Sequence, residues 1–317
     1  MAKPVLHARD HQPGGADPIP GFVTTTQPIS LPFYDVVEEI ALTTDLLGYW
    51  RLGDGASPFA DTSGHVGGAV DMVKQTGGTA MTDSIAGALI EGDDGAVEFN
   101  IGGSGAGDWL NGDGGNRFGF SSDSFTIACF VNPAASAGTF RGHALGNFRP
   151  GASGSYPGGY AIFVDWPTRT VRFIRAVSGS SSTTWDGCDG GSLTAGDWAF
   201  IVGTYDGTAD EMNMYVDGAL IDTAASTISE NGQVFPSIGR SSEPWINYVE
   251  PLGFMRPGGF LGGVDEASIW DGVLTPEEVA SLWSAASASA TALAGTVPVA
   301  DGAGGYDWGY PAIEVTY

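Results

Sequence analysis

Basic residues are scarce in this chain, because twelve Lys and Arg face 37 Asp and Glu, for a formal net charge of −25 over 317 residues. Such a field repels phosphate backbones and anionic lipid head groups. No apolar run is long enough to span a bilayer, and the N-terminus lacks the pattern of a secretory signal peptide. We therefore expect a protein made in a cytoplasm, with no nucleic-acid partner and no membrane insertion.

Cysteine and histidine are also rare, with two and four residues. Cys129 lies in an apolar segment typical of a buried strand, whereas Cys188 lies in a polar, Gly-rich stretch that favours a loop. Two cysteines alone neither establish nor exclude a disulfide. Two of the histidines, His7 and His11, lie in the N-terminal stretch HARDHQPGGADPI, which is unlike the rest of the chain.

Glycine and aromatic residues are plentiful, with 50 glycines and 11% aromatics, so the chain has material for a core and for many loops. Six prolines in residues 1–33 predict an extended arm, because each proline fixes its own φ and restricts its predecessor. Residues 34–47 predict a linker helix. Asp35 and Glu38 fit a capping pattern there, and an apolar stripe includes Val36, Val37 and Ile40.

From Gly48 onwards the apolar pattern repeats every two residues, which is typical of strands. The predicted strands fall within residues 48–53, 96–101, 124–132, 159–165, 170–176, 198–205, 212–218 and 261–270. Both faces of the 124–132 strand are apolar, so we expect it to be covered on both sides. Asp217 and Gly218 predict the two-residue turn of a hairpin. Many strands with little helix between them predict an all-β, antiparallel two-sheet sandwich or jelly roll.

One helix is predicted to close this region. Thr275 is its expected N-cap, Pro276 its first residue, and Glu278 completes a capping box. An Ala/Ser-rich linker and an aromatic, extended C-terminal tail follow, and we assign both to a final segment, residues 286–317.

Four segments in order, LGYWRLGDGASPFADTSGHVGG, FTIACFVNP, GDWAFIVGTYDGTADEMNMYVDGAL and GGVDEASIWDGVLTPEEVASLW, resemble the concanavalin A-like, laminin-G-type jelly-roll family. The resemblance covers residues 48–285 and implies recognition of carbohydrate or protein rather than catalysis. It also implies a calcium site, for which the matching residues are Asp54, Asp61 and Asp265. The alternative is that Asp54 and Asp61 form turns and Asp265 caps a strand end.

The N-terminal stretch resembles a motif near the N-terminus of many tailed-phage virion proteins. The residues that carry this resemblance are His7, His11, Gly14, Gly15, Asp17 and Pro18. It implies that the arm, residues 1–33, anchors the chain to other virion proteins, and that the protein is located in the virion.

A glycan-binding surface is expected to use loop aromatics, because sugar rings stack on flat side chains while amide and carboxylate groups fix the hydroxyls. The candidates are Trp109, Trp185, Asp186, Trp245, Asn247 and Tyr248. The alternative is that each loop tryptophan packs beneath its own loop. Trp50, Trp198, Trp270 and Trp283 lie in predicted strands or on the capped helix and are expected in the core.

The function predicted from these patterns is a minor tail or tail-fibre protein that binds host cell-surface polysaccharide. One alternative is a head-decoration protein that contacts only virion proteins. A polysaccharide-cleaving enzyme is the less favoured alternative, because the carboxylate pairs Asp265–Glu266 and Asp210–Glu211 are adjacent and face opposite sides of a regular strand. We therefore expect no enzymatic activity.

We also expect a homo-oligomer, with a trimer favoured. In a trimer, His7 and His11 would bring six imidazoles together, enough to complete an octahedral transition-metal site. The alternative is that both histidines form hydrogen bonds to a docking partner.

Overall fold

The computed structural model describes residues 32–77, 79–89, 95–100, 107–148, 158–178, 183–229, 235–240, 257–294, 299–300 and 306–307. The predicted anchoring residues, from His7 to Pro18, lie outside this part of the chain, as do Trp245, Asn247 and Tyr248. No helix in the described ranges is long and apolar enough to cross a membrane.

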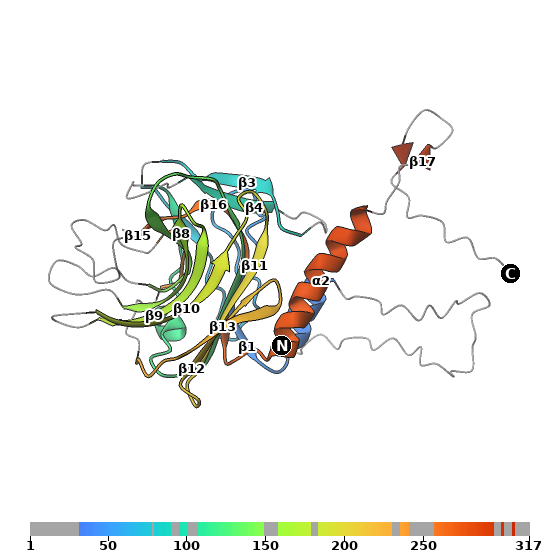
Figure 1. Ribbon diagram of the computed structural model, residues 1–317. Helices are drawn as coiled ribbons and strands as arrows, with labels where there is room; N and C mark the ends of the chain where they lie inside the picture. The colour runs from blue at the N-terminus through green and yellow to red at the C-terminus, as the bar shows by residue number, and fades with distance from the viewer. Residues whose placement is uncertain are drawn as a thin grey trace, which may run out of the picture. The chain divides into compact units, whose positions relative to one another are not determined.

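Two large sheets face each other (Figure 1). The first sheet has the order β13-β12-β11-β6-β16-β4-β3, and β1 also pairs with β16. Its strands are β1 (Asp45–Trp50), β3 (Thr82–Ala86), β4 (Gly95–Asn100), β6 (Phe125–Pro133), β11 (Ala199–Asp206), β12 (Glu211–Val216), β13 (Ala219–Ala225) and β16 (Leu261–Asp271).

The second sheet has the order β10-β9-β8-β7-β14-β5-β2, and β15 runs parallel to β7. Its strands are β2 (Val73–Gln75), β5 (Trp109–Asn111), β7 (Phe140–Gly146), β8 (Gly159–Trp166), β9 (Thr170–Ser178), β10 (Thr183–Ser192), β14 (Ser237–Ile238) and β15 (Pro257–Gly259). A 3-10 turn, η1 (Gly115–Phe118), and a two-stranded pair, β17 (Val299–Ala300) with β18 (Tyr306–Asp307), complete the described elements. The predicted all-β jelly-roll sandwich is confirmed.

The main core lies between the two sheets. On β6, Phe125, Ile127, Cys129 and Val131 all point into it, while the intervening Ala128 and Phe130 belong to a second cluster on the opposite side. The prediction that this strand is covered on both faces is therefore confirmed. Trp50 and Trp270 are fully buried, as predicted, and Trp198 and Trp283 are partly buried against the second cluster.

Two helices cover the outer face of the first sheet, on the side away from the second sheet (Figure 1). Helix α1 (Phe33–Ile40) buries the predicted stripe and Phe33, whose ring meets Phe130 and Phe200 edge-on at centroid distances of 5.7 and 6.0 Å. Its start differs from the prediction, because Pro32 is the N-cap and makes no side-chain cap hydrogen bond. Pro32 suits this place, since a fixed φ and a missing N–H cost little at a helix start.

Helix α2 (Pro276–Ala294) begins with the predicted capping box. The Thr275 N–H donates to Glu278 Oε2 at 2.7 Å, and the Glu278 N–H donates to Thr275 Oγ1 at 3.2 Å. The helix continues to Ala294, although the Ala/Ser-rich segment was expected to be a linker. Alanine has the highest intrinsic helix propensity, and serine can hydrogen-bond its hydroxyl to a preceding carbonyl, as Ser281 does with Glu277 O at 2.8 Å.

Strand β10 corrects a second expectation. Its residues, TTWDGCDGGS, were predicted to form a loop, but they pair with β9 from Thr183 to Asp189. The glycines serve packing here: a Cβ at Gly187 would lie 3.0 Å from Phe173 O, and one at Gly190 would lie 2.6 Å from Val171 Cγ1. Cys188 is consequently buried, and both cysteines are free thiols.

The predicted hairpin turn between β12 and β13 is confirmed. Asp217 and Gly218 have φ values of +51° and +76°. Positive φ at both central residues defines the turn type that matches the twist of antiparallel strands.

Candidate functional site

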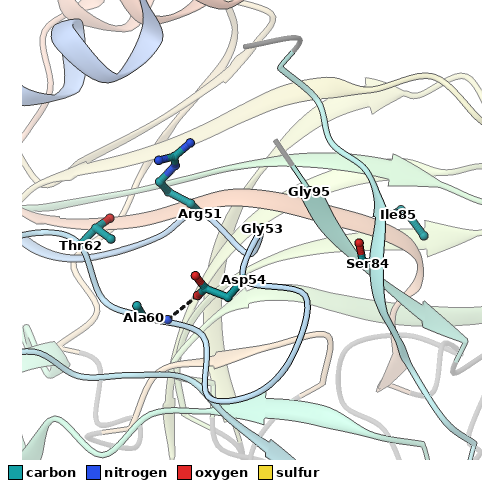
Figure 2. A pocket seen from close by; sticks show the side chains of 8 residues that line it. All are labelled: Arg51, Gly53, Asp54, Ala60, Thr62, Ser84, Ile85 and Gly95. Atoms are coloured by element: carbon teal, nitrogen blue, oxygen red, sulfur yellow. Dashed lines mark hydrogen bonds between the residues drawn. The ribbon is translucent and has the colours of Figure 1, made fainter. Parts of the chain in front are cut away.

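A polar pocket of about 600 Å³ opens beside the first sheet. Its lining residues come from the segment after β1, from β3 and from the first residue of β4 (Figure 2). They are Arg51, Gly53, Asp54, Ala60, Thr62, Ser84, Ile85 and Gly95. A volume of this order falls in the usual range for small-molecule sites, and the wall offers a guanidinium, a carboxylate and two hydroxyls.

The chain builds one wall by turning back on itself directly after β1. Leu52 and Gly55 adopt positive φ values of +59° and +71°. Asp54 Oδ2 then accepts a hydrogen bond of 2.7 Å from the Ala60 N–H (Figure 2). On the other side, a Cβ at Gly95 would lie 3.2 Å from Gly53 Cα, so glycine lets β4 approach this turn closely.

Arg51 lines the pocket, and its guanidinium contacts Tyr34 and Glu266. Its guanidinium carbon lies 3.8 Å from the centroid of the Tyr34 ring, and its Nε lies 4.0 Å from Glu266 Oε1. Figure 2 shows the guanidinium on the side of the pocket away from the Asp54 carboxylate. Cation–π contact and a nearby carboxylate both hold a guanidinium in one orientation, while 39% of the side chain stays exposed.

Glu266, the carboxylate beside Arg51, is buried and contacts two tyrosines. It accepts hydrogen bonds from the hydroxyls of Tyr34, at 3.1 Å, and Tyr49. Burial, and then the charge of Glu266, raise the pKa of Tyr49 well above its ordinary value, so Tyr49 keeps its proton and remains a donor. Glu266 has a φ of +47° and lies where the register of β16 shifts. The premise of a regular strand at Asp265–Glu266 is therefore wrong, because a bulge is present there.

Asp61, a predicted calcium ligand, is instead the centre of a hydrogen-bonded loop. Its carboxylate accepts from the backbone N–H groups of Tyr49, Ser63 and Val70 at 3.1, 3.0 and 2.8 Å. Its positively charged partner is Arg117, whose Nη2 lies 3.2 Å from Asp61 Oδ2. The guanidinium thus supplies the charge that a metal ion was expected to supply.

The other two predicted ligands have different surroundings. Asp54 bonds to Ala60, and Asp265 accepts from the Ala88 N–H at 2.8 Å. Among the described residues, no three His, Cys, Asp or Glu side chains are grouped to hold a metal ion. The described structure therefore does not group Asp54, Asp61 and Asp265 as a site, and calcium binding stays a prediction.

Trp109 and Trp185 lie on strands of the second sheet and not in loops. Trp185 is paired with Ala176 and packs against the cluster that contains Phe163. Trp109 lies on β5, with the Arg240 guanidinium carbon 4.9 Å from its ring. Both side chains are partly buried, as is Asp186 beside Trp185, and none of the three lines the pocket.

The face of the second sheet turned away from the core carries a row of charges that the sequence did not reveal. Arg141 Nε and Nη2 donate to Asp165 at 2.6 and 3.1 Å, and Arg172 Nε donates to the same carboxylate at 2.7 Å. Nearby on β7, His143 is fully buried, and burial lowers its pKa to about 4. The row was missed because residues 140–146, FRGHALG, contain two glycines and no β-branched residue, a composition that does not favour a strand.

These features define a two-sheet jelly roll with a polar pocket beside its first sheet. A family model for the concanavalin A-like lectin/glucanases superfamily, laminin-G type, matches residues 104–280. The chain belongs to this superfamily. No curated protein matches the chain.

Among solved structures, the similar folds include binding domains of botulinum neurotoxins. A type C structure, described as entering cells through two ganglioside molecules, is 13% identical with a TM-score of 0.53, over 78% of this chain and 52% of that one. The serotype G binding domain is 12% identical with a TM-score of 0.52, over 80% and 53%. The DC binding domain in complex with SialylT is 11% identical with a TM-score of 0.51, over 75% and 51%. This chain spans about half the length of those structures, and the likeness concerns the fold.

Proposed function

We propose that this chain is a glycan-binding protein of a virion appendage, and that the pocket between Arg51 and Asp54 holds the saccharide. The supporting observation is the composition of the pocket. A sugar presents hydroxyls that both donate and accept hydrogen bonds. Asp54 can accept from them, Arg51 can donate to them, and the hydroxyls of Thr62 and Ser84 can do either.

The superfamily and the related structures support the same class of ligand. The superfamily includes lectins, and two similar neurotoxin structures are described with gangliosides and SialylT as what those proteins bind. The site itself is proposed from this chain's own residues, because identities of 11–13% carry no residue-by-residue correspondence.

Binding without cleavage is the role that the described carboxylates favour. Glycoside hydrolysis needs two carboxyl groups across the scissile bond, one of them ready to give up a proton. Asp165 is engaged by two guanidinium groups and Glu266 by two tyrosine hydroxyls. Both carboxylates are therefore committed to structural contacts, and we propose no catalytic step.

The glycan-binding proposal predicts that Arg51→Ala and Asp54→Ala each weaken binding by about 10- to 100-fold, since a hydrogen bond to a charged group contributes about 1.5–3 kcal/mol. The measurement is a glycan array, followed by titration calorimetry with the best ligand. Asp113→Ala is the matched control, because Asp113 is exposed and does not line the pocket. If both pocket variants bind as tightly as the control, the saccharide does not bind here.

The virion part of the proposal is supported by the N-terminal motif and concerns residues outside the described ranges. Deleting residues 1–31 should leave a folded sandwich, because α1 and all the contacts given above lie beyond that point. The truncated chain should then be missing from purified particles assembled in its presence. Incorporation at full occupancy would show that the arm is not the anchor. The trimer and the histidine metal site also stay predictions, which sedimentation and elemental analysis of the oligomer can test.

A further inference from the structure

We infer that the pocket selects acidic saccharides, with Arg51 binding a carboxylate of the sugar. This inference rests on the proposed glycan-binding function and names the ligand class. It starts from the hydrogen-bonding state of Arg51. Its Nε is buried and has no hydrogen-bond partner, and the nearest carboxylate oxygen, on Glu266, is 4.0 Å away, beyond hydrogen-bond distance.

Glu266 does not offer its charge to a ligand. It is buried, with a side chain that is 0% exposed, and both of its oxygens accept from tyrosine hydroxyls. Arg51, by contrast, is 39% exposed and lines the pocket. The group that it presents to a ligand is therefore a positively charged guanidinium, held in place by Tyr34 and Glu266.

A bound ligand interacts more strongly with the nearby charge of Arg51 than with the net charge of the whole protein. A net charge of −25 repels acidic polymers at long range. At physiological salt, however, charges more than about 8 Å apart are largely screened. A ligand already in the pocket interacts mainly with the charges that line it, and an Arg–carboxylate pair can form two parallel hydrogen bonds.

Asp54 fixes the orientation of such a ligand. Arg51 and Asp54 both line the pocket, yet Asp54 is bonded to Ala60, and the ion pair of Arg51 is with Glu266. The two charges are thus available at separate points of the pocket. A hexuronic or sialic acid can place its carboxylate at Arg51 and its hydroxyls at Asp54, whereas a neutral sugar leaves the guanidinium without a matching charge.

The test compares acidic oligosaccharides with their carboxyl-reduced counterparts, which keep the same ring and linkage but carry a hydroxymethyl group in place of the carboxylate. The panel contains hexuronic acid oligomers and sialylated oligosaccharides, each with its reduced partner. Titration calorimetry uses the full chain. We expect the wild-type protein to bind at least one acidic member about 10-fold or more tightly than its partner, with a preference that decreases as salt rises.

Substitutions of Arg51 test whether its guanidinium causes the preference for acidic ligands. Arg51→Gln should remove it and leave the reduced ligand nearly unaffected. Arg51→Lys should retain part of it, because lysine keeps the charge but loses the paired hydrogen bonds. Asp54→Asn should lower the affinity for both the acidic ligand and its reduced partner. Arg169→Gln is the matched control, since Arg169 lies in the β8–β9 turn and does not line the pocket. Melting curves confirm that each variant is folded.

The outcomes separate this inference from the proposed function. Equal affinity for acidic and reduced partners, or binding of neutral glycans alone, overturns the acidic selectivity and leaves glycan binding intact. A preference that persists in Arg51→Gln overturns the assignment to Arg51. Binding of no member of the panel and no glycan on the array contradicts the proposed function itself.

Discussion

Replacing Arg117 with alanine is expected to lower the free energy of unfolding by about 3–5 kcal/mol, because removing one partner of a buried ion pair leaves the other charge unpaired. The side chain of Asp61 is 0% exposed and that of Arg117 only 11%. Arg117 Nη1 also donates to Gly68 O at 2.6 Å, so the variant loses a second contact in the same loop. The measurement is the urea midpoint, and we expect the melting temperature to fall by roughly 10 °C.

Arg172→Ala is the matched control for this effect. Arg172 also pairs with a buried carboxylate, Asp165, but its side chain is 26% exposed and Asp165 keeps Arg141 as a partner. We expect a loss of about 1 kcal/mol or less, as for partly exposed ion pairs. Equal losses in the two variants would contradict the view that Arg117 alone neutralises Asp61.

The same melting experiment addresses calcium. A lower melting temperature of the wild-type protein in chelator would show that a metal ion stabilises some part of the chain, since a ligand bound only by the folded state stabilises it. Unchanged melting curves would indicate that Arg117, and not a metal ion, neutralises Asp61 in this loop.

The second large effect concerns the pH dependence of stability through His143. Burial lowers the pKa of this imidazole from 6.5 to about 4, so between these values the unfolded state binds a proton that the folded state does not. The contribution is fully present above pH 6.5 and is lost as the pH falls towards 4. At 1.36 kcal/mol per pKa unit, the loss amounts to about 3 kcal/mol.

The hydrogen bonds of His143 explain why its protonation is unfavourable. Its Nε2 lies 3.1 Å from Ser237 O and 3.2 Å from Ser237 Oγ, and in the tautomer with the proton on Nε2 it donates to the Ser237 carbonyl. Its Nδ1 is buried with no hydrogen-bond partner, so a proton added there would form a buried N–H without an acceptor.

Urea unfolding of the wild-type protein and His143→Gln between pH 4 and 7 measures this effect. The variant should be less stable at pH 7 and should lose less stability than the wild type on acidification. The wild-type protein supplies the reference slope. If His143→Gln keeps that slope, other groups account for the acid sensitivity.

Much of the sandwich could be predicted from local patterns. The eight strands expected from two-residue alternation are all present, because alternation records which side of a pleated strand meets the core. The Asp217–Gly218 turn and the Thr275–Glu278 capping box were also predicted. Each depends on neighbours a few residues away, so the sequence alone contains the information.

Strands β7 and β10 were not predicted, because their pairing depends on residues of neighbouring strands and not on their own pattern. Strand β10 was hidden by glycines whose missing side chains make room for Phe173 and Val171. Strand β7 carries Arg141 and His143 on the face turned away from the main core, yet both side chains are buried. Their burial depends on Asp165 and Ser237, which the sequence cannot place beside them.

The sequence by itself determined the jelly roll, its hairpin turn, its capped helix and its acidic character, because these follow from short-range periodicity, turn chemistry and composition. Only the tertiary structure decided which charged groups meet. Tyr49 and Glu266 are 217 positions apart and Arg117 and Asp61 are 56 apart, yet these contacts support Arg51 at the pocket and satisfy the carboxylate expected to bind calcium. Such pairings are set by how the sheets and helices pack, which no local pattern of residues specifies.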